Sequence, residues 1–201
     1  MDFKERVRNS IIQGAIIYKE VFVDYDYLIY SDKFSKKPYY VISAAEDNYP
    51  HLTGINPLLP ARDFYYKCLS GTLHSSDFNF EIKNSSEKSV KGTVRRKIKT
   101  LQLLSTLFDR NLQAEEDFSK GKVNCTLGTT DNSLTIGFID STALRPKTLL
   151  TNNQLNAGKS VDITLILRRT RGSKKFDTVI QSDIKRFQDA YPDIVGIVHI
   201  L

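Results

Sequence analysis

The sequence predicts an α+β fold, in which N-terminal helices pack on an antiparallel β-sheet of about four strands. Apolar residues recur at helical spacing within residues 3–23 and 88–112, whereas residues 123–138 alternate apolar and polar side chains, as half-buried strands do. Helices come first and strands cluster later, and this order favours an antiparallel sheet over a doubly wound parallel one. Because no internal repeat or low-complexity linker interrupts the chain, residues 1–201 are expected to form one domain.

The first part of the chain, residues 1–24, is expected to be an amphipathic helix. Its apolar stripe consists of Phe3, Val7, Ile11, Ala15, Tyr18 and Phe22. Residues 25–112 follow as a mainly helical part with two short strands and a loop that contains His51. The elements expected there are strands at 27–30 and 39–42 and helices at 61–69 and 88–112.

The last part, residues 123–201, is expected to supply the antiparallel sheet and a C-terminal helix. A polar turn at residues 130–133 separates two alternating stretches, so residues 123–138 are predicted to form a hairpin. The remaining expected elements are a strand at 148–150, a second hairpin from 161–169 and 176–181, a helix at 182–190 and an apolar tail that ends at Leu201.

The composition excludes several classes of protein. Hydrophobic residues at 40% and charged residues at 26% are ordinary globular values and argue against disorder. The most apolar stretch near the N-terminus, residues 11–30, contains Lys19, Glu20, Asp24 and Asp26. Charges at these positions are costly in a bilayer, so neither an export signal nor contact with a membrane is expected.

Only two cysteines occur, Cys68 and Cys125, and they lie far apart in the sequence. Secreted proteins stabilised by disulfides usually carry more, so both are expected to be reduced core thiols of a cytoplasmic protein. These cysteines and the three scattered histidines show no zinc-ligand spacing, and no acidic cluster indicates a two-metal nuclease. We therefore expect neither a metal nor a cofactor.

The charge of the chain favours a polyanionic partner. Lysine and arginine number 29 against 23 acids, which leaves +6, and cations gain from counterion release at phosphates. Two basic runs contain no acid: Lys91, Arg95, Arg96, Lys97 and Lys99 in the first, and Arg168, Arg169, Arg171, Lys174 and Lys175 in the second. Arg95, Arg96 and Arg169 are candidate RNA contacts if the second hairpin packs near the long helix; otherwise both runs are solvated surfaces.

His51 is the candidate proton-transfer residue. It lies within residues 50–55 (PHLTGI), which are predicted to form a loop after a strand. An imidazole titrates near pH 7, the neighbouring Thr53 hydroxyl can support it, and Gly54 allows close approach of a ligand. The alternative is an ordinary histidine in a surface turn.

Lys97 is the candidate catalytic cation. On a helical wheel it falls inside the apolar stripe of residues 90–108, close to Val90 and Leu104, whereas Arg96 falls on the opposite face. An ammonium that faces the core is unfavourable unless it is paired or solvated in a cleft, which favours a phosphate-binding lysine in an active site. The alternative is a lysine that snorkels at the edge of the stripe.

Arg145 and Lys147 flank a proline just after the first hairpin. The proline fixes a turn at a sheet-edge segment, and either cation could hold a phosphate. The alternative is that both charges protect an edge strand from pairing with another chain.

The order of these features resembles the phage-associated branch of the Barnase–EndoU–colicin–RelE nuclease superfold. The resemblance covers about residues 38–182 and rests on short motifs. They are PHLTGI at 50–55, FYYK at 64–67, the lysine-bearing helix, LTIGF at 134–138, RPKTLL at 145–150 and KFD at 175–177.

The resemblance implies a fold of helices on a four-stranded antiparallel sheet and RNA cleavage without a metal. His51 would then be the acid or base, and Thr53 would orient His51 or the phosphate. Lys97 would be the cation, with Arg145 or Lys147 as a second phosphate contact. A toxin of a phage or mobile-element system, opposed by an acidic antitoxin or immunity protein, is the implied setting. Glu46 is the nearest candidate carboxylate.

Two other functions stay open at this point. One is a non-catalytic RNA- or protein-binding module of the same fold, which would show salt-dependent RNA binding without cleavage. The other is a phage or host-defence interaction protein whose active site has decayed.

Overall fold

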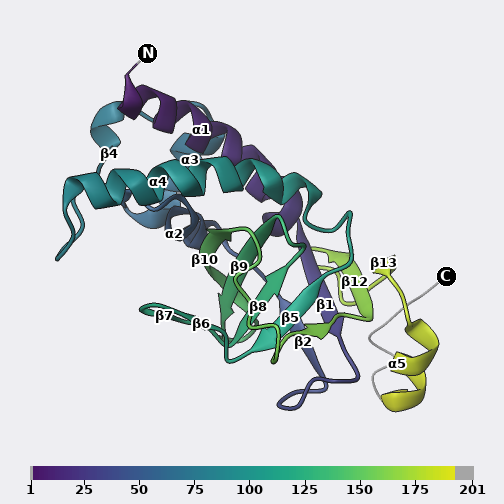
Figure 1. Cartoon of the computed structure of the whole chain (residues 1–201). Helices are drawn as coiled ribbons and strands as arrows, with labels where there is room; N and C mark the ends of the chain where they lie inside the picture. The colour runs from purple at the N-terminus through teal and green to yellow at the C-terminus, as the bar shows by residue number, and fades with distance from the viewer. Residues whose placement is uncertain (1, 193–201) are drawn as a thin grey trace.

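The computed structural model describes residues 2–192, and the predicted apolar tail that ends at Leu201 lies outside the described residues. A layer of helices lies across one end of a strand-rich body (Figure 1). The predicted α+β class with antiparallel pairing is confirmed. No helix within residues 2–192 is long and apolar enough to span a bilayer.

The helical layer contains α1 (Phe3–Tyr18), α2 (Tyr49–Thr53), α3 (Ala61–Leu69) and α4 (Glu87–Leu101). A π-helical turn at Lys19–Val23 continues α1, and a 3-10 turn at Gln102–Thr106 continues α4. Asp2 begins α1 by accepting a hydrogen bond from Glu5 N at 2.8 Å, and Ser86 begins α4 in the same way. The predicted helix at 88–112 ends early, because α4 stops at Leu101 and its 3-10 continuation stops at Thr106.

The strands form two larger sheets and two short ribbons. The four-stranded sheet has the order β13 (Thr178–Gln181), β12 (Leu165–Thr170), β1 (Tyr25–Tyr30), β2 (Tyr39–Ile42). The five-stranded sheet has the order β10 (Arg145–Thr151), β9 (Leu134–Ile139), β8 (Leu127–Thr130), β5 (Gln113–Glu116), β11 (Val161–Asp162). The ribbons pair β3 (Asn56–Pro57) with β4 (Phe78–Asn79), and β6 (Ser119–Lys120) with β7 (Val123–Asn124); helix α5 is Ile184–Ala190.

The two sheets are joined at two places. On one side Leu144 N donates to Val41 O at 2.8 Å, and on the other Thr164 N donates to Tyr30 O at 2.9 Å. The stretch 161–169, predicted as one strand, is therefore split, because Ile163 N bonds to Leu112 O and the chain crosses from one sheet to the other. Strand β1 lies between β12 and β2, so the strands are not confined to residues 123–201, and within residues 2–192 a five-stranded sheet accompanies the four-stranded one.

Strand β5 was not predicted from the sequence. Its residues (QAEE) lack apolar alternation, and its two acids are held by hydrogen bonds instead. Glu115 is buried and accepts from Asn156 N at 2.7 Å, and Glu116 accepts from the Tyr40 hydroxyl at 2.6 Å. These hydrogen bonds satisfy the two acids within the sheet, while Ala114 of the same strand is buried in the main core.

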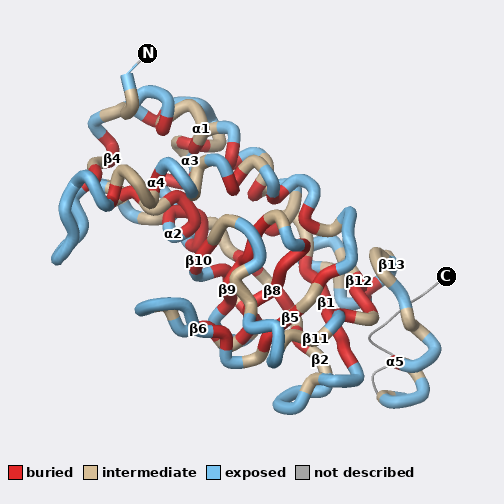
Figure 2. Tube along the Cα trace, viewed as in Figure 1, coloured by how far each residue is buried: buried red, intermediate tan, exposed pale blue. Residues whose placement is uncertain are grey.

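The main core lies between the helical layer and the sheets (Figure 2). Tyr27 and Ile29 of β1 face this core, whereas Leu28 and Tyr30 face a second cluster that Phe187 of α5 covers. The predicted thiols are confirmed: the two cysteines are free and buried.

Candidate functional site

His51 lies on a short helix, which corrects the prediction of a loop. Helix α2 has five residues, with Pro50 in its first turn and Gly54 after its end at φ +77°. Proline is tolerated where a helix begins and glycine where it ends, so residues 50–54 carry both signals for a helix. The segment is too short for periodicity to reveal it.

Thr53 is fully buried and faces the interior of this turn. Its hydroxyl donates to Pro50 O at 2.7 Å, and Ile55 N donates to the same hydroxyl at 3.4 Å. Both polar functions of the side chain are therefore engaged within residues 50–55, and Thr53 does not reach a ligand directly.

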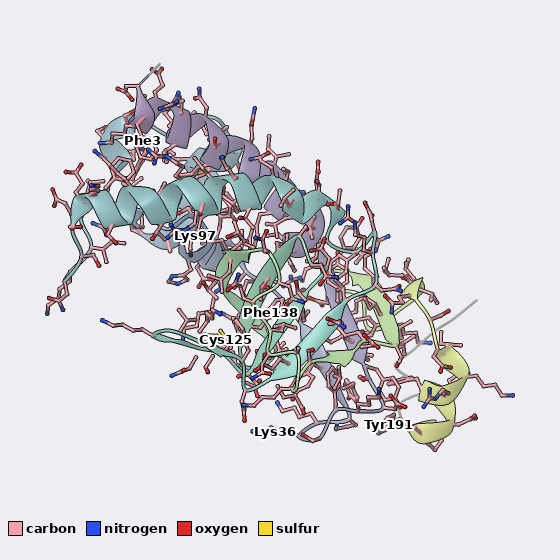
Figure 3. All side chains as sticks on the ribbon, in the orientation of Figure 1. Phe3, Lys36, Lys97, Cys125, Phe138 and Tyr191 are labelled. Atoms are coloured by element: carbon pink, nitrogen blue, oxygen red, sulfur yellow. The ribbon has the colours of Figure 1, made fainter. Side chains whose placement is uncertain are left out.

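Lys97 crosses from α4 to α2, as the view with side chains shows (Figure 3). Its Nζ donates to the main-chain oxygen of His51 at 2.7 Å, although the two residues are 46 positions apart. Burial lowers the pKa of Lys97 to about 8. The ammonium retains two further N–H donors for another group.

Gly54 makes room for this lysine. A Cβ at position 54 would lie 2.9 Å from Lys97 Cδ. We expect Gly54→Ala to destabilise the protein by roughly 1–2 kcal/mol for the positive φ alone. We also expect it to displace Lys97 toward solvent, so that the pKa of Lys97 rises from about 8 toward its usual 10.5. Thermal unfolding and an NMR titration of the lysine side chains measure the two effects.

Gly71 provides the matched control, because it has φ +73° and nothing within 4 Å of its added Cβ. Gly71→Ala should lower the stability through the same backbone strain and leave the pKa of Lys97 unchanged. Equal Lys97 titrations in the two variants would contradict the proximity of Gly54 and Lys97.

The charges around His51 oppose its protonation. Partial burial is the largest cause of its lowered pKa, followed by the nearby ammonium groups of Lys97 and Lys147, whereas Asp47 acts in the opposite direction. The predicted carboxylate, Glu46, is not the one that acts on the imidazole: it accepts from the Tyr66 hydroxyl at 3.3 Å and pairs with an arginine. Asp47 lies four residues before His51 in continuous helical backbone, a spacing that brings side chains together.

A pocket of about 190 Å³ lies beside Lys97, between α4 and β10, and we call it the Lys97 pocket. It is lined by Thr93, Arg96, Lys97, Lys120, Leu149, Leu150, Thr151 and Gln154, and no acid is among them. Arg96 was predicted on the face opposite the apolar stripe and is exposed, yet its side chain lines the same pocket as Lys97. Thr93, Arg96 and Lys97 are spaced at i, i+3 and i+4, and therefore share one side of the helix.

Arg145 and Lys147 lie on β10, the edge strand of the five-stranded sheet. Pairing with β9 shifts register between Pro146 and Thr148, which leaves Lys147 exposed at the irregularity. Lys147 Nζ donates to Asn124 O at 3.0 Å and contributes to the lowered pKa of His51. Arg145 is half-buried at the start of the strand.

Arg95 lies outside the Lys97 pocket. Its guanidinium lies over the ring of Phe3 at 5.2 Å, in a groove between α1 and α4. It is therefore separated from Lys97 by the width of α4.

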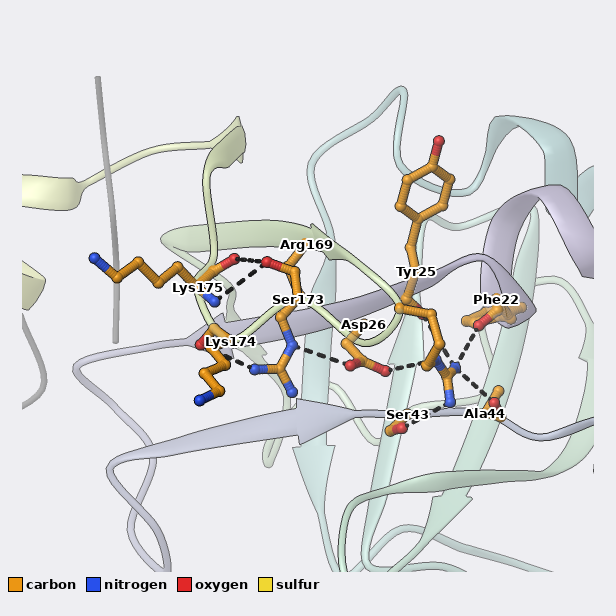
Figure 4. Close-up of polar contacts among 10 residues, drawn as sticks. Phe22, Tyr25, Asp26, Ser43, Ala44, Arg169, Ser173, Lys174 and Lys175 are labelled. Carbon is orange, nitrogen blue, oxygen red and sulfur yellow. Dashed lines mark hydrogen bonds and ion pairs between the residues drawn. The ribbon is translucent and has the colours of Figure 1, made fainter. Parts of the chain in front are cut away.

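Arg169 is also placed away from the pocket, on β12, across the molecule from α2 (Figure 1). Its Nε lies 3.0 Å from Asp26 (Figure 4). Its guanidinium covers the ring of Phe176, 4.6 Å from the ring centroid. Asp26 is only 3% exposed, so these contacts occupy Arg169 inside the fold. The second hairpin does not extend the basic surface of α4.

Arg171 forms a second ion pair with Asp26, at 3.1 Å, in addition to the one made by Arg169. It also anchors the segment that leads to α2. Its guanidinium donates to Ala44 O at 2.6 Å, to Phe22 O at 3.0 Å and to the Ser43 hydroxyl at 3.0 Å (Figure 4). The sequence placed Arg171 only within a basic run, since its acceptors are mainly backbone oxygens that no side-chain pattern reveals.

The structure thus places Arg96, Lys97 and Lys120 around one pocket and brings Lys97, Lys147 and Asp47 near enough to His51 for their charges to shift its pKa. The sequence analysis did not select Lys120 or Asp47. Within residues 2–192, no three His, Cys, Asp or Glu side chains gather where a metal could be held. The site consists of several cations, one imidazole and the carboxylate of Asp47.

The fold and the site define an α+β protein with a cationic cleft at the junction of two helices and a sheet edge. The family described as phage-Barnase-EndoU-ColicinE5/D-RelE like nuclease4 matches residues 10–185. The chain belongs to this nuclease family, which confirms the resemblance found in the sequence. No curated protein and no solved structure matches the chain.

Proposed function

We propose that the protein is an endoribonuclease that cleaves RNA by general acid–base transesterification without a metal ion. The observation that carries the proposal is the 2.7 Å hydrogen bond from Lys97 Nζ to the main-chain oxygen of His51, which holds the ammonium beside the residue whose imidazole pKa it lowers. RNA suits such a pair because its own 2′-hydroxyl is the nucleophile. The protein then has to move two protons and stabilise the charge of the phosphorane.

His51 is the general base in this scheme. Its imidazole removes the proton of the 2′-hydroxyl, O2′ attacks the adjacent phosphorus, and the bond from phosphorus to O5′ breaks. Because partial burial and the neighbouring ammonium groups lower the pKa of His51, the imidazole is largely neutral at pH 7 and can accept this proton.

Lys97 is the general acid and the main cation. With a pKa of about 8, its ammonium is mostly protonated at pH 7, yet it donates a proton more readily than an ordinary lysine. It stabilises the negative charge of the phosphorane and protonates the departing O5′. Arg96 and Lys147 hold the phosphate oxygens, with Arg145 further along β10, and Thr53 is a positioning residue that keeps the turn of α2 in shape.

We also propose that this activity is that of a cytoplasmic toxin from a phage or mobile-element system. The support is the family itself, which is described as phage-associated nucleases. An antitoxin or immunity protein that covers the cleft would present acidic side chains, because the Lys97 pocket is lined by three cations and no acid.

Purified protein in excess chelator is expected to cleave single-stranded RNA and to leave 2′,3′-cyclic phosphate ends. It should leave DNA and fully 2′-O-methylated RNA intact, because both lack the nucleophile. Gel analysis of end-labelled oligonucleotides measures both results. If the folded protein leaves every RNA pool intact in chelator, the proposal is contradicted.

The same hydrogen bond also supports a second function. Lys97 satisfies a carbonyl at the end of α2, so the pair can equally serve as a structural support in a non-catalytic RNA- or protein-binding module. Such a module would bind RNA with steep salt dependence and without cleavage, and His51→Ala would leave its affinity unchanged.

A further inference from the structure

The ribbon of β6 and β7 is a second cationic element at the cleft. It leaves the five-stranded sheet between β5 and β8 and projects from the body on the side of α2 (Figure 1). Lys120 of β6 lines the Lys97 pocket, and Lys122 lies in the tight turn next to Gly121, which has φ +60°. Both lysines are exposed, and neither has an ion-pair partner among residues 2–192.

The base of the ribbon packs against two glycines of the five-stranded sheet. Gly128 and Gly137 face each other across β8 and β9. An added Cβ would lie 2.6 Å from the ring of Phe118 at the first glycine and 2.6 Å from Cys125 Sγ at the second. Phe118 precedes β6 and Cys125 follows β7, and Cys125 N donates to Phe118 O at 2.8 Å. The two glycines thus let both ends of the ribbon lie flat on the sheet, which sets its direction.

A further hydrogen bond ties the ribbon to the cleft. Lys147 Nζ donates to the main-chain oxygen of Asn124, the last residue of β7, at 3.0 Å. The same ammonium opposes protonation of His51. The ribbon is therefore held beside the groups of the proposed reaction and does not project independently of them.

We propose that this ribbon is a phosphate-binding arm for single-stranded RNA. Lys120, together with Arg96, binds a backbone phosphate next to the one at His51 and Lys97, and Lys122 extends the binding along the strand. The proposal rests on the proposed ribonuclease function and names how its substrate is held. The basis is geometric and electrostatic: exposed, unpaired ammonium groups on an anchored ribbon line a pocket without acids, and such groups bind phosphates without reading sequence.

The test uses the double variant Lys120→Met with Lys122→Met and a fluorescent, fully 2′-O-methylated oligoribonucleotide that cannot be cleaved. For single-stranded nucleic acid, each phosphate neutralised by a lysine contributes about 0.7 to the slope of log K for binding against log salt, so each removed contact lowers the magnitude of the slope by that amount. We therefore expect the double variant to bind more weakly and to show a slope shallower by about 1.4. Fluorescence anisotropy across a salt series measures it, and thermal unfolding checks the fold.

Lys174→Met with Lys175→Met removes two exposed charges from the turn before β13 and is the matched control, expected to bind like the wild type. An unchanged slope in the ribbon variant, an equal decrease in the control, or no salt-dependent binding by the wild type would each overturn the proposal. Cleavage is assayed separately on a dinucleotide, whose single phosphate does not reach the arm. If the protein cleaves no RNA but still binds the oligonucleotide through the ribbon lysines, the proposed ribonuclease function is refuted and the proposed phosphate-binding arm is supported.

Discussion

Lys97→Met should lower kcat/KM for RNA cleavage by about 10²–10³, because it removes the ammonium that stabilises the phosphorane. Methionine retains a flexible apolar stem of similar length, so the packing between α4 and Gly54 should persist. The fold should persist as well, since the residue is half-buried and the variant removes only one hydrogen bond, to His51 O. Steady-state cleavage of a short RNA, with thermal unfolding alongside, measures the effect.

Lys99→Met is the matched control for charge. Lys99 is exposed on the same helix and lines the groove toward α1, outside the Lys97 pocket. Its removal should change kcat/KM less than about twofold. Lys97→Arg separates the two proposed roles, since arginine keeps the charge but cannot release a proton near neutral pH. A folded Lys97→Met enzyme as active as Lys99→Met would remove Lys97 from the mechanism.

His51→Gln should lower kcat/KM by about 10²–10⁴, because glutamine cannot accept the proton of the 2′-hydroxyl. In the wild type we expect a bell-shaped pH profile of kcat/KM. A base works only when neutral, so activity is lost as the pH falls through the His51 pKa, which lies below the usual 6.5. An acid works only when protonated, so activity is also lost as the pH rises through about 8, the pKa of Lys97.

The acidic limb of that profile should vanish in His51→Gln, while the alkaline limb remains in the residual activity. His74→Gln is the control, because His74 is an exposed histidine away from the Lys97 pocket. Its profile should match the wild type. If the acidic limb persists in His51→Gln, another group is the base, and His51 only positions the RNA.

Several elements could be predicted from the sequence with close boundaries. Strand β2 at 39–42 and helix α3 at 61–69 match their predictions, and α1 with its continuation covers residues 3–23. Their signals are local: apolar spacing, proline before a helix and polar turns between strands. The split of residues 161–169 between two sheets has no such signal, because the hydrogen bonds that divide it come from Tyr30 and Leu112.

The fold class, the helical position of Lys97 and the order of motifs typical of the nuclease family can be predicted from the amino-acid sequence. Which cations lie around the Lys97 pocket depends on the folded structure. Arg169 is bound by Asp26, 143 residues away, whereas Lys120, in a short polar ribbon, reaches the pocket. Local patterns reflect which side chains are buried. Whether a charged side chain finds an ion-pair partner depends on residues that folding brings close. The same holds for the pKa of Lys97, because burial beside α2 lowers it.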